Sequence, residues 1–330
     1  MYEYQPPFNI TNEIIDYISK IMEKIGNIDN YKDLDRLPRL RKQNRIRSIY
    51  SSCAIEANSL SLSEVTDIVN GKTVVGDETE IKEVKNAIEA YDLIEQIDPY
   101  SLKNLLEIHK IIANNLISNS GTLRSNAEGV FDGDRCIFIA PPSNMVPHLM
   151  ESLFAWMKEN QGKIHPLLLS CIFHYEFVFI HPFKDGNGRM ARLWQTALLG
   201  KYKPIFYWMP IENYIKDNQK EYYEAISKSH SNGNCTVFIE FMLKMIDETL
   251  IKIKKEINKH AYHLSIYIQK LLNVMEVSVP LTSNEIMQKL NIKSKEALRN
   301  NYIKPAIDSG LIYLEIPDKP TSRNQRYIRK

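Results

Sequence analysis

Apolar residues recur at steps of three and four along most of this chain, and no other feature restricts its fold as strongly. In residues 11–28 the apolar positions are Ile14, Ile15, Ile18, Ile21, Met22 and Ile25. This spacing places an apolar stripe on one face of an α-helix. The same spacing returns at about 39–57, 62–70, 77–97, 101–116, 145–160, 164–180, 188–200, 211–229 and 235–261. We therefore expect an all-α core.

One segment departs from the helical pattern. In residues 129–139, GVFDGDRCIFI, β-forming residues lie on both sides of an Asp-Gly-Asp turn. This arrangement predicts a small β-hairpin. An isolated two-stranded hairpin has little stability of its own, so it either packs against a larger unit or covers a site.

The sequence pattern changes again after the last long helix. Residues 282–285 (TSNE) predict a capped helix start, residues 291–294 (NIKS) a turn and residues 295–309 a second helix. Residues 311–314 and 325–328 have the pattern of two strands. Helix, turn, helix and hairpin together predict a winged helix-turn-helix module.

The length of 330 residues exceeds that of a usual single domain. We expect a helical N-terminal region over residues 1–100, a helical core over 101–261 and the winged module over 262–330. Charged residues make up 25% and hydrophobic residues 44%, as in ordinary globular proteins. The formal charge is only +2, so attraction to nucleic acid requires a local basic patch.

The sequence has no sign of export or membrane insertion. Its first ten residues are polar and contain prolines, and no apolar stretch approaches the length of a membrane span. The cysteines are scattered without a CxxC pair, which indicates reduced thiols; they are Cys53, Cys136, Cys171 and Cys235. We expect a cytoplasmic protein that does not bind membranes.

Residues 181–192, HPFKDGNGRMAR, predict a phosphate-binding loop. Gly186 and Gly188 flank Asn187 between an apolar helix and a new helix that begins around Gly188. Unpaired backbone N–H groups at the start of a helix hold phosphate groups without using side chains. Asn187 either adds a donor or takes the backbone angles that such a turn requires.

Charged and titratable side chains complete this loop. Arg189 and Arg192 lie three residues apart on the new helix, so both can reach the same polyphosphate. Asp185 is a hard oxygen ligand of the kind that holds Mg²⁺ together with nucleotide phosphates. His181 can take a proton from an attacking hydroxyl near neutral pH. We expect structural roles for His109, His148, His165, His174, His230, His260 and His263.

The segment resembles the Fic family signature HPFx[D/E]GNGRxxR, whose specified positions are met by His181, Pro182, Phe183, Asp185, Gly186, Asn187, Gly188, Arg189 and Arg192. The resemblance implies an all-α Fic core with a hairpin flap. It also implies that His181 deprotonates a Ser, Thr or Tyr hydroxyl of a target protein, which attacks the α-phosphorus of ATP. Asp185 would hold Mg²⁺, the amides of residues 186–188 an anion, and Arg189 and Arg192 the β- and γ-phosphates. Relatives of this fold transfer other groups, and AMP is our default.

A second segment, residues 51–58, resembles the inhibitory motif of this family, [S/T]xxxE followed by Gly or Asn. Ser52 and Glu56 are in register, whereas Ala57 stands where the motif has Gly and Asn58 follows one residue later. A carboxylate that pairs with Arg192 would displace the γ-phosphate of ATP. We therefore expect a helix over about 40–58 to inhibit the enzyme, and the same carboxylate to serve in removal of AMP if that reaction occurs.

The resemblance assigns three further groups of residues. The hairpin becomes a flap that docks the target by strand-like pairing through Ile137, Phe138 and Ile139. Residues 121–124 (GTLR) fit the GxxR lead-in of the family. Asn218 would line the adenine pocket, with Tyr222 and Tyr223 nearby.

A different class of function is also open. Basic residues outnumber acidic ones over 280–330, so the winged module can be a DNA-binding wing. The chain would then be a transcription regulator whose helical domain senses nucleotide, a hypothesis that gives His181 no role. Neither hypothesis identifies the target protein, and modification of the chain itself and a homodimer both remain open.

Overall fold

The computed structural model describes residues 4–27, 38–127, 129–132, 135–263, 266–320 and 322–330. The chain divides into two compact units. The first consists of Met1–Asn27 and Asn44–Ile251, and the second of Ile28–Gln43 and Lys252–Lys330. The boundaries expected at residues 100 and 261 stay predictions.

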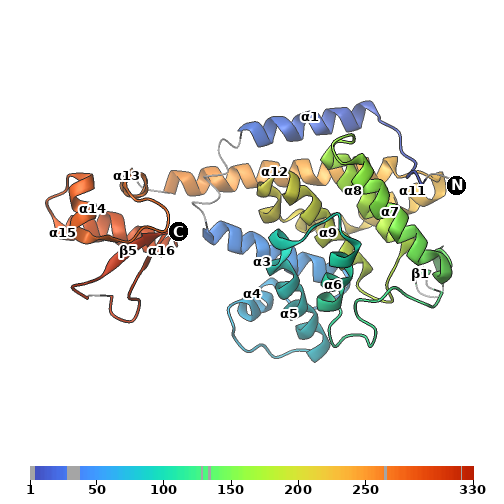
Figure 1. The fold of residues 1–330 in the computed structure, drawn as a ribbon, viewed down its shortest axis with the longest axis horizontal. Coiled ribbons are helices and arrows are strands. Elements are labelled where there is room, and N and C mark those ends of the chain that lie inside the picture. The colour runs from blue at the N-terminus through green and yellow to red at the C-terminus, as the bar shows by residue number, and fades with distance from the viewer. Residues whose placement is uncertain (1–3, 28–37, 128, 133–134, 264–265, 321) are drawn as a thin grey trace. The chain divides into compact units, whose positions relative to one another are not determined.

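The first unit is built almost entirely of helices, so the predicted all-α core is confirmed (Figure 1). Its helices are α1 (Asn12–Asn27), α3 (Pro38–Ile55), α4 (Leu62–Val69), α5 (Glu78–Asp92), α6 (Leu102–Ile112), α7 (Val146–Asn160), α8 (Pro166–Ile180), α9 (Asn187–Tyr202), α10 (Ile211–Asp217), α11 (Gln219–Asn232) and α12 (Thr236–His263), with 3-10 helices at Ile94–Gln96, Ser143–Met145 and Pro204–Trp208. Helices α3 and α12 continue into the second unit.

Two predicted helices are interrupted. The helix expected over 77–97 ends at Asp92 and continues as a 3-10 turn. The helix expected over 211–229 divides at Asn218, where the backbone leaves the helical region at a φ of −120°. The Asn218 side chain donates a hydrogen bond to the Tyr214 carbonyl at 2.8 Å. This bond adds to the one that the Asn218 backbone N–H donates to the same carbonyl at 3.0 Å, at the end of α10.

Helices α8 and α9 lie at the centre of the first unit (Figure 1). Helix α8 is apolar on all sides and almost completely buried, which is typical of a helix inside a core. Its Phe173 packs at 6.5 Å against Trp194 of α9, whose indole N–H donates to the Pro99 carbonyl at 3.0 Å. Because both helices are enclosed, the short loop that joins them is supported from both ends.

The predicted hairpin consists of β1 (Gly129–Asp132) and β2 (Arg135–Ile139), which pair antiparallel with a bulge after Val130. Phe138 stacks on His230 of α11 with ring centroids 4.2 Å apart and also contacts Phe179 of α8 at 5.5 Å. The next residue, Ile139, is 75% exposed. The hairpin therefore packs against the helical core through Phe138, and Ile139 faces solvent.

The second unit contains α13 (Ile266–Val274), α14 (Ser283–Leu290) and one bent helix made of Lys295–Ala297, Leu298–Ile303 and Lys304–Asp308. Its three strands, β3 (Leu281–Thr282), β4 (Ile312–Leu314) and β5 (Arg326–Arg329), form an antiparallel sheet in the order β3-β5-β4. The capping box expected at Thr282 and Glu285 is present. The middle of the bent helix is a π-helix just before Pro305, whose nitrogen has no proton to donate.

Two histidines, His109 and His174, are buried in the helical core, and a third, His230, is partly buried against it. His174 of α8 is completely buried, with Nδ1 2.6 Å from the Gln195 side-chain oxygen and Nε2 3.0 Å from the Tyr222 hydroxyl. Burial lowers the pKa of His174 to about 3 and the pKa values of His109 and His230 to about 4. All three are therefore neutral in the folded protein near pH 7.

Acidification is expected to lower the free energy of unfolding between pH 6.5 and about 4. In this window the unfolded chain binds protons at these three histidines and the folded chain does not, so stability is highest above the window. Each histidine contributes up to about 1.4 kcal/mol per pH unit. Urea unfolding across the window measures the slope, and His230→Gln should make it shallower. An unchanged slope in that variant would contradict the assignment.

Candidate active site

The motif loop connects the end of α8 to the start of α9. His181 closes α8 in the left-handed region at a φ of 50°, and its N–H donates to the Phe177 carbonyl at 2.9 Å. Gly186 also has a positive φ, 80°, and the first residue of α9 is Asn187. The structure thus places the loop between two helices, as the sequence predicts.

Asn187 holds the loop closed. Its side-chain oxygen accepts the Phe183 N–H at 2.9 Å, and its side-chain nitrogen donates to the Phe183 carbonyl at 2.7 Å. Phe183 itself is fully buried. The side-chain amide of Asn187 is used in these bonds, and Gly186 takes the left-handed turn. Asn187 can therefore bind an anion through its backbone N–H.

His109 of α6 supports the same loop, a role that its position in the sequence does not reveal. Its ring stacks on Phe183 with centroids 3.5 Å apart and planes 3° apart. Nδ1 accepts the Gly121 N–H at 2.9 Å, so Nε2 carries the proton that bonds the Asp185 carbonyl at 3.0 Å. The neutral ring, whose pKa burial lowers to about 4, therefore fixes the backbone of Asp185.

Arg124, from the GTLR segment, joins the loop to the base of the hairpin. Its backbone N–H donates to the Pro182 carbonyl at 2.9 Å. Its guanidinium, almost fully buried, donates to the carbonyls of His181 at 2.7 Å, Asn126 at 2.8 Å, Pro141 at 2.6 Å and Ile180 at 3.3 Å. The backbone around His181 and the two ends of the flap are consequently held by one side chain.

Ser52 and Glu56, on and just beyond α3, meet Arg192 of α9. The Arg192 Nη2 lies 2.8 Å from the Glu56 carboxylate and donates to the Ser52 carbonyl at 2.9 Å, while Nε donates to the Ser52 hydroxyl at 3.1 Å. Only 1% of the Arg192 side chain is exposed. Burial lowers the pKa of Arg192, but the charge and hydrogen bond of Glu56 together with Tyr222 and Tyr91 outweigh burial, and the net shift is upward. The guanidinium therefore stays charged.

Gly188 leaves the space that Glu56 occupies. A Cβ atom built on Gly188 would overlap the Glu56 carboxylate and lie 3.0 Å from the Arg192 Nη1. The Glu56 side chain is 34% exposed, so it reaches the start of α9 from the solvent side. A glycine at this position thus leaves room for the Glu56–Arg192 contact. It also leaves the backbone N–H groups of the loop accessible.

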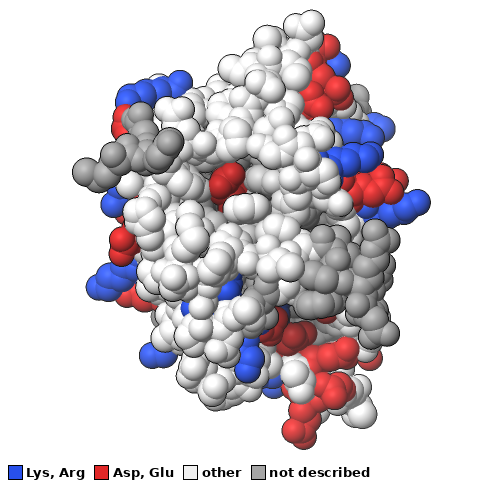
Figure 2. Space-filling model, turned by 90° about the vertical axis from the view of Figure 1, so that its right-hand side faces the viewer, with Lys and Arg blue, Asp and Glu red and all other residues white. Residues whose placement is uncertain are grey.

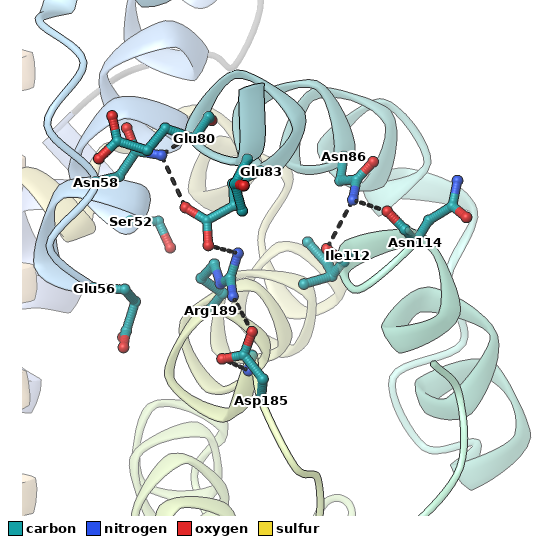
Figure 3. A network of polar contacts seen from close by, with 12 residues as sticks. Ser52, Glu56, Asn58, Glu80, Glu83, Asn86, Ile112, Asn114, Asp185 and Arg189 are labelled. Atoms are coloured by element: carbon teal, nitrogen blue, oxygen red, sulfur yellow. Dashed lines mark hydrogen bonds and ion pairs between the residues drawn. The ribbon is translucent and has the colours of Figure 1, made fainter. Parts of the chain in front are cut away.

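Arg189, the other motif arginine, lies between two carboxylates (Figure 3). Its Nη2 is 3.0 Å from Asp185 and its Nη1 is 3.0 Å from Glu83 of α5. The Asp185 side chain is 48% exposed and that of Glu83 is 17% exposed. The sequence gives no sign of Glu83, because it is one of many acidic residues on an amphipathic helix.

Asp185 is the candidate carboxylate for holding a cation. Among the residues that the structure describes, no group of three or more His, Cys, Asp and Glu side chains is arranged to hold a metal ion. A single half-exposed carboxylate suits Mg²⁺, which keeps several waters and binds substrate phosphates in preference to an all-protein cage. Asp185 would supply one ligand, and Mg²⁺ would neutralise charge on the nucleotide.

The remaining predicted site residues lie in different surroundings. Phe138 packs inward, Ile139 faces solvent, and the side chain of Ile137 is outside the described residues. Asn218 joins α10 to α11 through its bond to Tyr214, and the adenine pocket expected there stays a prediction. Tyr222 is buried, whereas Tyr223 is 46% exposed.

The fold and the site together define the Fic family, and the chain belongs to it. Residues 99–199 match the Fic/DOC family, and residues 267–328 match the family described as filamentation induced by cAMP protein Fic-like, C-terminal domain. The crystal structure of a Fic family protein from Desulfovibrio desulfuricans G20 is 39% identical and has a TM-score of 0.74; the match covers 99% of this chain and 98% of that one. Fic-1 from C. elegans, 21% identical with a TM-score of 0.61 over 76% of this chain and 73% of that one, shares the fold.

Curated relatives include proteins named "Protein adenylyltransferase Fic" from Aedes aegypti and Nematostella vectensis, each 28% identical. The matches cover 65% and 73% of this chain but 42% and 56% of those proteins. The chain thus spans about half the length of the curated relatives that it matches. None of the described helices is both long and apolar enough to cross a membrane.

A methyl group at Gly188 is expected to destabilise the folded protein by about 1–3 kcal/mol, because it would overlap the Glu56 carboxylate. The Gly188→Ala change should cost much less in a Glu56→Gly background, where the carboxylate is gone. Urea unfolding of the two single variants and the double variant measures this coupling. Equal costs in both backgrounds would show that Glu56 does not lie against Gly188.

The turn after α3 is strained at Ala57. The Asn58 N–H bonds the Cys53 carbonyl at 3.2 Å and the Ala57 N–H bonds the Ala54 carbonyl at 3.1 Å, the paired bonds of a Schellman motif. Ala57 takes its left-handed position, with a φ of 66°, which glycine adopts without strain. Ala57, which stands where the family's inhibitory motif has Gly, therefore occupies a position whose backbone conformation suits Gly better.

Replacing Ala57 with Gly is expected to stabilise the protein by about 0.5–1 kcal/mol, since relief of left-handed strain exceeds the added flexibility of the unfolded chain. Thermal unfolding measures the effect. The matched control Ala54→Gly, in the helical part of α3, should instead destabilise by about 1 kcal/mol. Loss of stability in Ala57→Gly would refute the strained turn.

Proposed function

We propose that this chain transfers AMP from ATP to a Ser, Thr or Tyr hydroxyl of a target protein and that Glu56 holds it in an inhibited state. Membership of the Fic family and relatives named protein adenylyltransferase support the reaction. The observation that carries the inhibited state is the contact between the Glu56 carboxylate and the buried Arg192 guanidinium.

The reaction follows from the residues around the loop. The His181 imidazole takes the proton of the target hydroxyl, and the oxygen then forms a bond to the α-phosphorus of ATP. The bond from the α-phosphorus to the bridging oxygen breaks, and pyrophosphate leaves. The backbone N–H groups of residues 186–188 and the Arg189 and Arg192 side chains bind the phosphates. The bonds from Arg124 and His109 keep this loop in one position.

Inhibition follows from competition for Arg192. Ser52 accepts two hydrogen bonds from the Arg192 guanidinium, and the charged Glu56 carboxylate accepts a third. A γ-phosphate that reaches Arg192 must replace Glu56, because both anions need the same donors. ATP then binds without its γ-phosphate in place, and the α-phosphorus is not aligned for attack. In removal of AMP, the same carboxylate would orient a water molecule.

The target would dock on the flap. Ile139 is exposed at the end of β2, and a strand edge offers backbone groups to an extended peptide. Figure 2 shows the side of the molecule where β1 and α11 lie. Its central area consists mostly of uncharged side chains, with a small acidic group in a hollow and other charged side chains toward the margins. An uncharged stretch of a target protein, or of a second copy of this chain, fits such a face.

A second candidate is a DNA-binding regulator that senses nucleotide. It is favoured by Lys295, Arg299 and Lys304, which are all exposed on the bent helix of the second unit. A gel-shift assay at moderate salt tests it. Sequence-selective binding that His181→Ala does not alter would support the regulator over the enzyme.

Glu56→Gly is expected to raise AMP incorporation at least roughly tenfold, because loss of a hydrogen bond to a charged competitor is worth about 1.5–3 kcal/mol. Incubation with labelled ATP, followed by mass spectrometry of the protein and of lysate proteins, measures the transferred group. The double variant Glu56→Gly, His181→Ala is the control and should incorporate none. Equal incorporation by Glu56→Gly and the unaltered protein would refute the inhibition, and an added mass other than AMP would refute the reaction.

A further inference from the structure

Glu83 of α5 connects two parts of the site that are far apart in sequence. One of its carboxylate oxygens lies 3.0 Å from the Arg189 Nη1, and the other accepts a hydrogen bond from the Asn58 side chain at 2.9 Å. Asn58 is the second residue after Glu56 and closes the Schellman turn. Figure 3 shows Glu83 between Asn58 and Arg189, with Asp185 on the far side of the arginine. A single carboxylate thus joins the inhibitory turn to a phosphate-binding arginine.

The charges around Arg189 give Glu83 a role that Asp185 does not fill. The Arg189 side chain is only 4% exposed, and a buried guanidinium without a partner is costly. Asp185 lies on the loop, is half exposed and is the candidate carboxylate for holding a cation. When a cation takes the Asp185 oxygens, Glu83 remains as the partner of Arg189. Glu83 therefore neutralises the charge of the Arg189 guanidinium and keeps its orientation when Asp185 binds a cation instead.

The Asn58 side chain has a fixed orientation. Its oxygen accepts the Leu60 N–H at 3.2 Å, and its nitrogen donates to the Glu80 carbonyl at 3.1 Å as well as to Glu83. Rotation of the amide would place like groups against each other at all three contacts. Asn58 is also almost fully buried. The bond to Glu83 is therefore a defined link between the turn and α5.

Helix α5 is held independently of the inhibitory helix. Asp77 caps its start by accepting the N–H groups of Thr79 at 2.8 Å and Glu80 at 3.0 Å. One turn after Glu83, Asn86 donates to the carbonyls of Ile112 at 3.1 Å and Asn114 at 2.9 Å, at the end of α6 (Figure 3). Glu83 consequently stands on a fixed support from which it can restrain the turn.

We propose that Glu83 is a positioning residue with two effects: it directs Arg189 toward the nucleotide phosphates and, through Asn58, it holds the turn that places Glu56 on Arg192. The proposal rests on the function proposed above. Glu56 cannot leave Arg192 by movement of the turn unless the Asn58–Glu83 bond breaks. Inhibition therefore depends on the Asn58 side-chain amide and the Glu83 carboxylate, neither of which contacts Arg192.

The first experiment changes the turn and leaves Glu56 intact. Asn58→Asp keeps the size of the side chain and the acceptor for the Leu60 N–H but places a second carboxylate against Glu83. AMP incorporation should rise at least roughly threefold over the unaltered protein, since one hydrogen bond to a charged group is lost. In a Glu56→Gly background the same change should produce no increase. Ser59→Ala is the matched control, because it removes a bond from the same loop to Glu80 and does not reach Glu83.

The second experiment changes the charge and keeps the link. In the Glu56→Gly background, Glu83→Gln retains an oxygen that can accept from Asn58 but loses the charge opposite Arg189. The KM for ATP should rise roughly tenfold, with kcat changed much less, because Arg189 loses a charged partner that orients it. Glu83→Asp restores a carboxylate and should recover part of the loss. A fall in kcat at unchanged KM would overturn the assignment of Glu83 to Arg189.

A third readout does not depend on catalysis. Hydrogen–deuterium exchange of the backbone amides of residues 53–58 should be faster in Asn58→Asp than in the unaltered protein and unchanged in Ser59→Ala. This measurement uses no nucleotide, so it tests the Asn58–Glu83 bond independently of the reaction. If Glu56→Gly incorporates no AMP, the proposed function fails, but the exchange experiment can still be read. Unchanged exchange in Asn58→Asp, or equal stimulation by it in both backgrounds, would overturn the role of Asn58.

Discussion

The burial of Arg192 is the constraint on which the rest of the site depends. A guanidinium that is almost entirely removed from water must have its charge and its donors satisfied inside the protein. Ser52, on α3, and Glu56, just beyond it, satisfy them, so in the proposed function the segment that brings these residues also obstructs a phosphate. Burial strengthens the attraction of Arg192 for anions. For the same reason the buried charge needs an anion beside it.

In the proposed function inhibition acts through a single contact, and the surroundings of the loop give the reason. Buried groups hold the loop on every side: Phe183 against His109, Asn187 across the turn, and Arg124 at its start. None of these bonds involves α3, so the phosphate-binding geometry does not require the inhibitory helix. The turn after α3, by contrast, is strained at Ala57 and depends on a few polar bonds. The proposed switch requires this combination of a rigid loop and a less firmly held turn.

Much of the fold and part of the site could be predicted from local pattern. Helical spacing predicted most of the helices of the first unit, because one buried face determines that spacing. It did not predict the break at Asn218, which depends on a bond that the side chain makes within its own turn. The motif placed His181, Asp185 and the arginines together, since a short loop keeps neighbouring residues close. The GxxR resemblance pointed to Arg124 without giving it a role, whereas His109 and Glu83 were not assigned to the site, because each lies far from the motif in sequence and has no distinctive spacing.

The sequence by itself determined the helical architecture, the loop and the candidate chemistry, because each depends on residues within a few positions of one another. The resemblance to the inhibitory motif predicted that Glu56 meets Arg192, whereas only the tertiary structure showed that Glu83 meets Arg189. Glu56 lies against Arg192 and Glu83 against Arg189 because the fold brings the end of α3 and α5 to these arginines of α9, and no local pattern states which helices will meet. Charged partners that are distant in sequence are chosen by the packing of the apolar faces behind them.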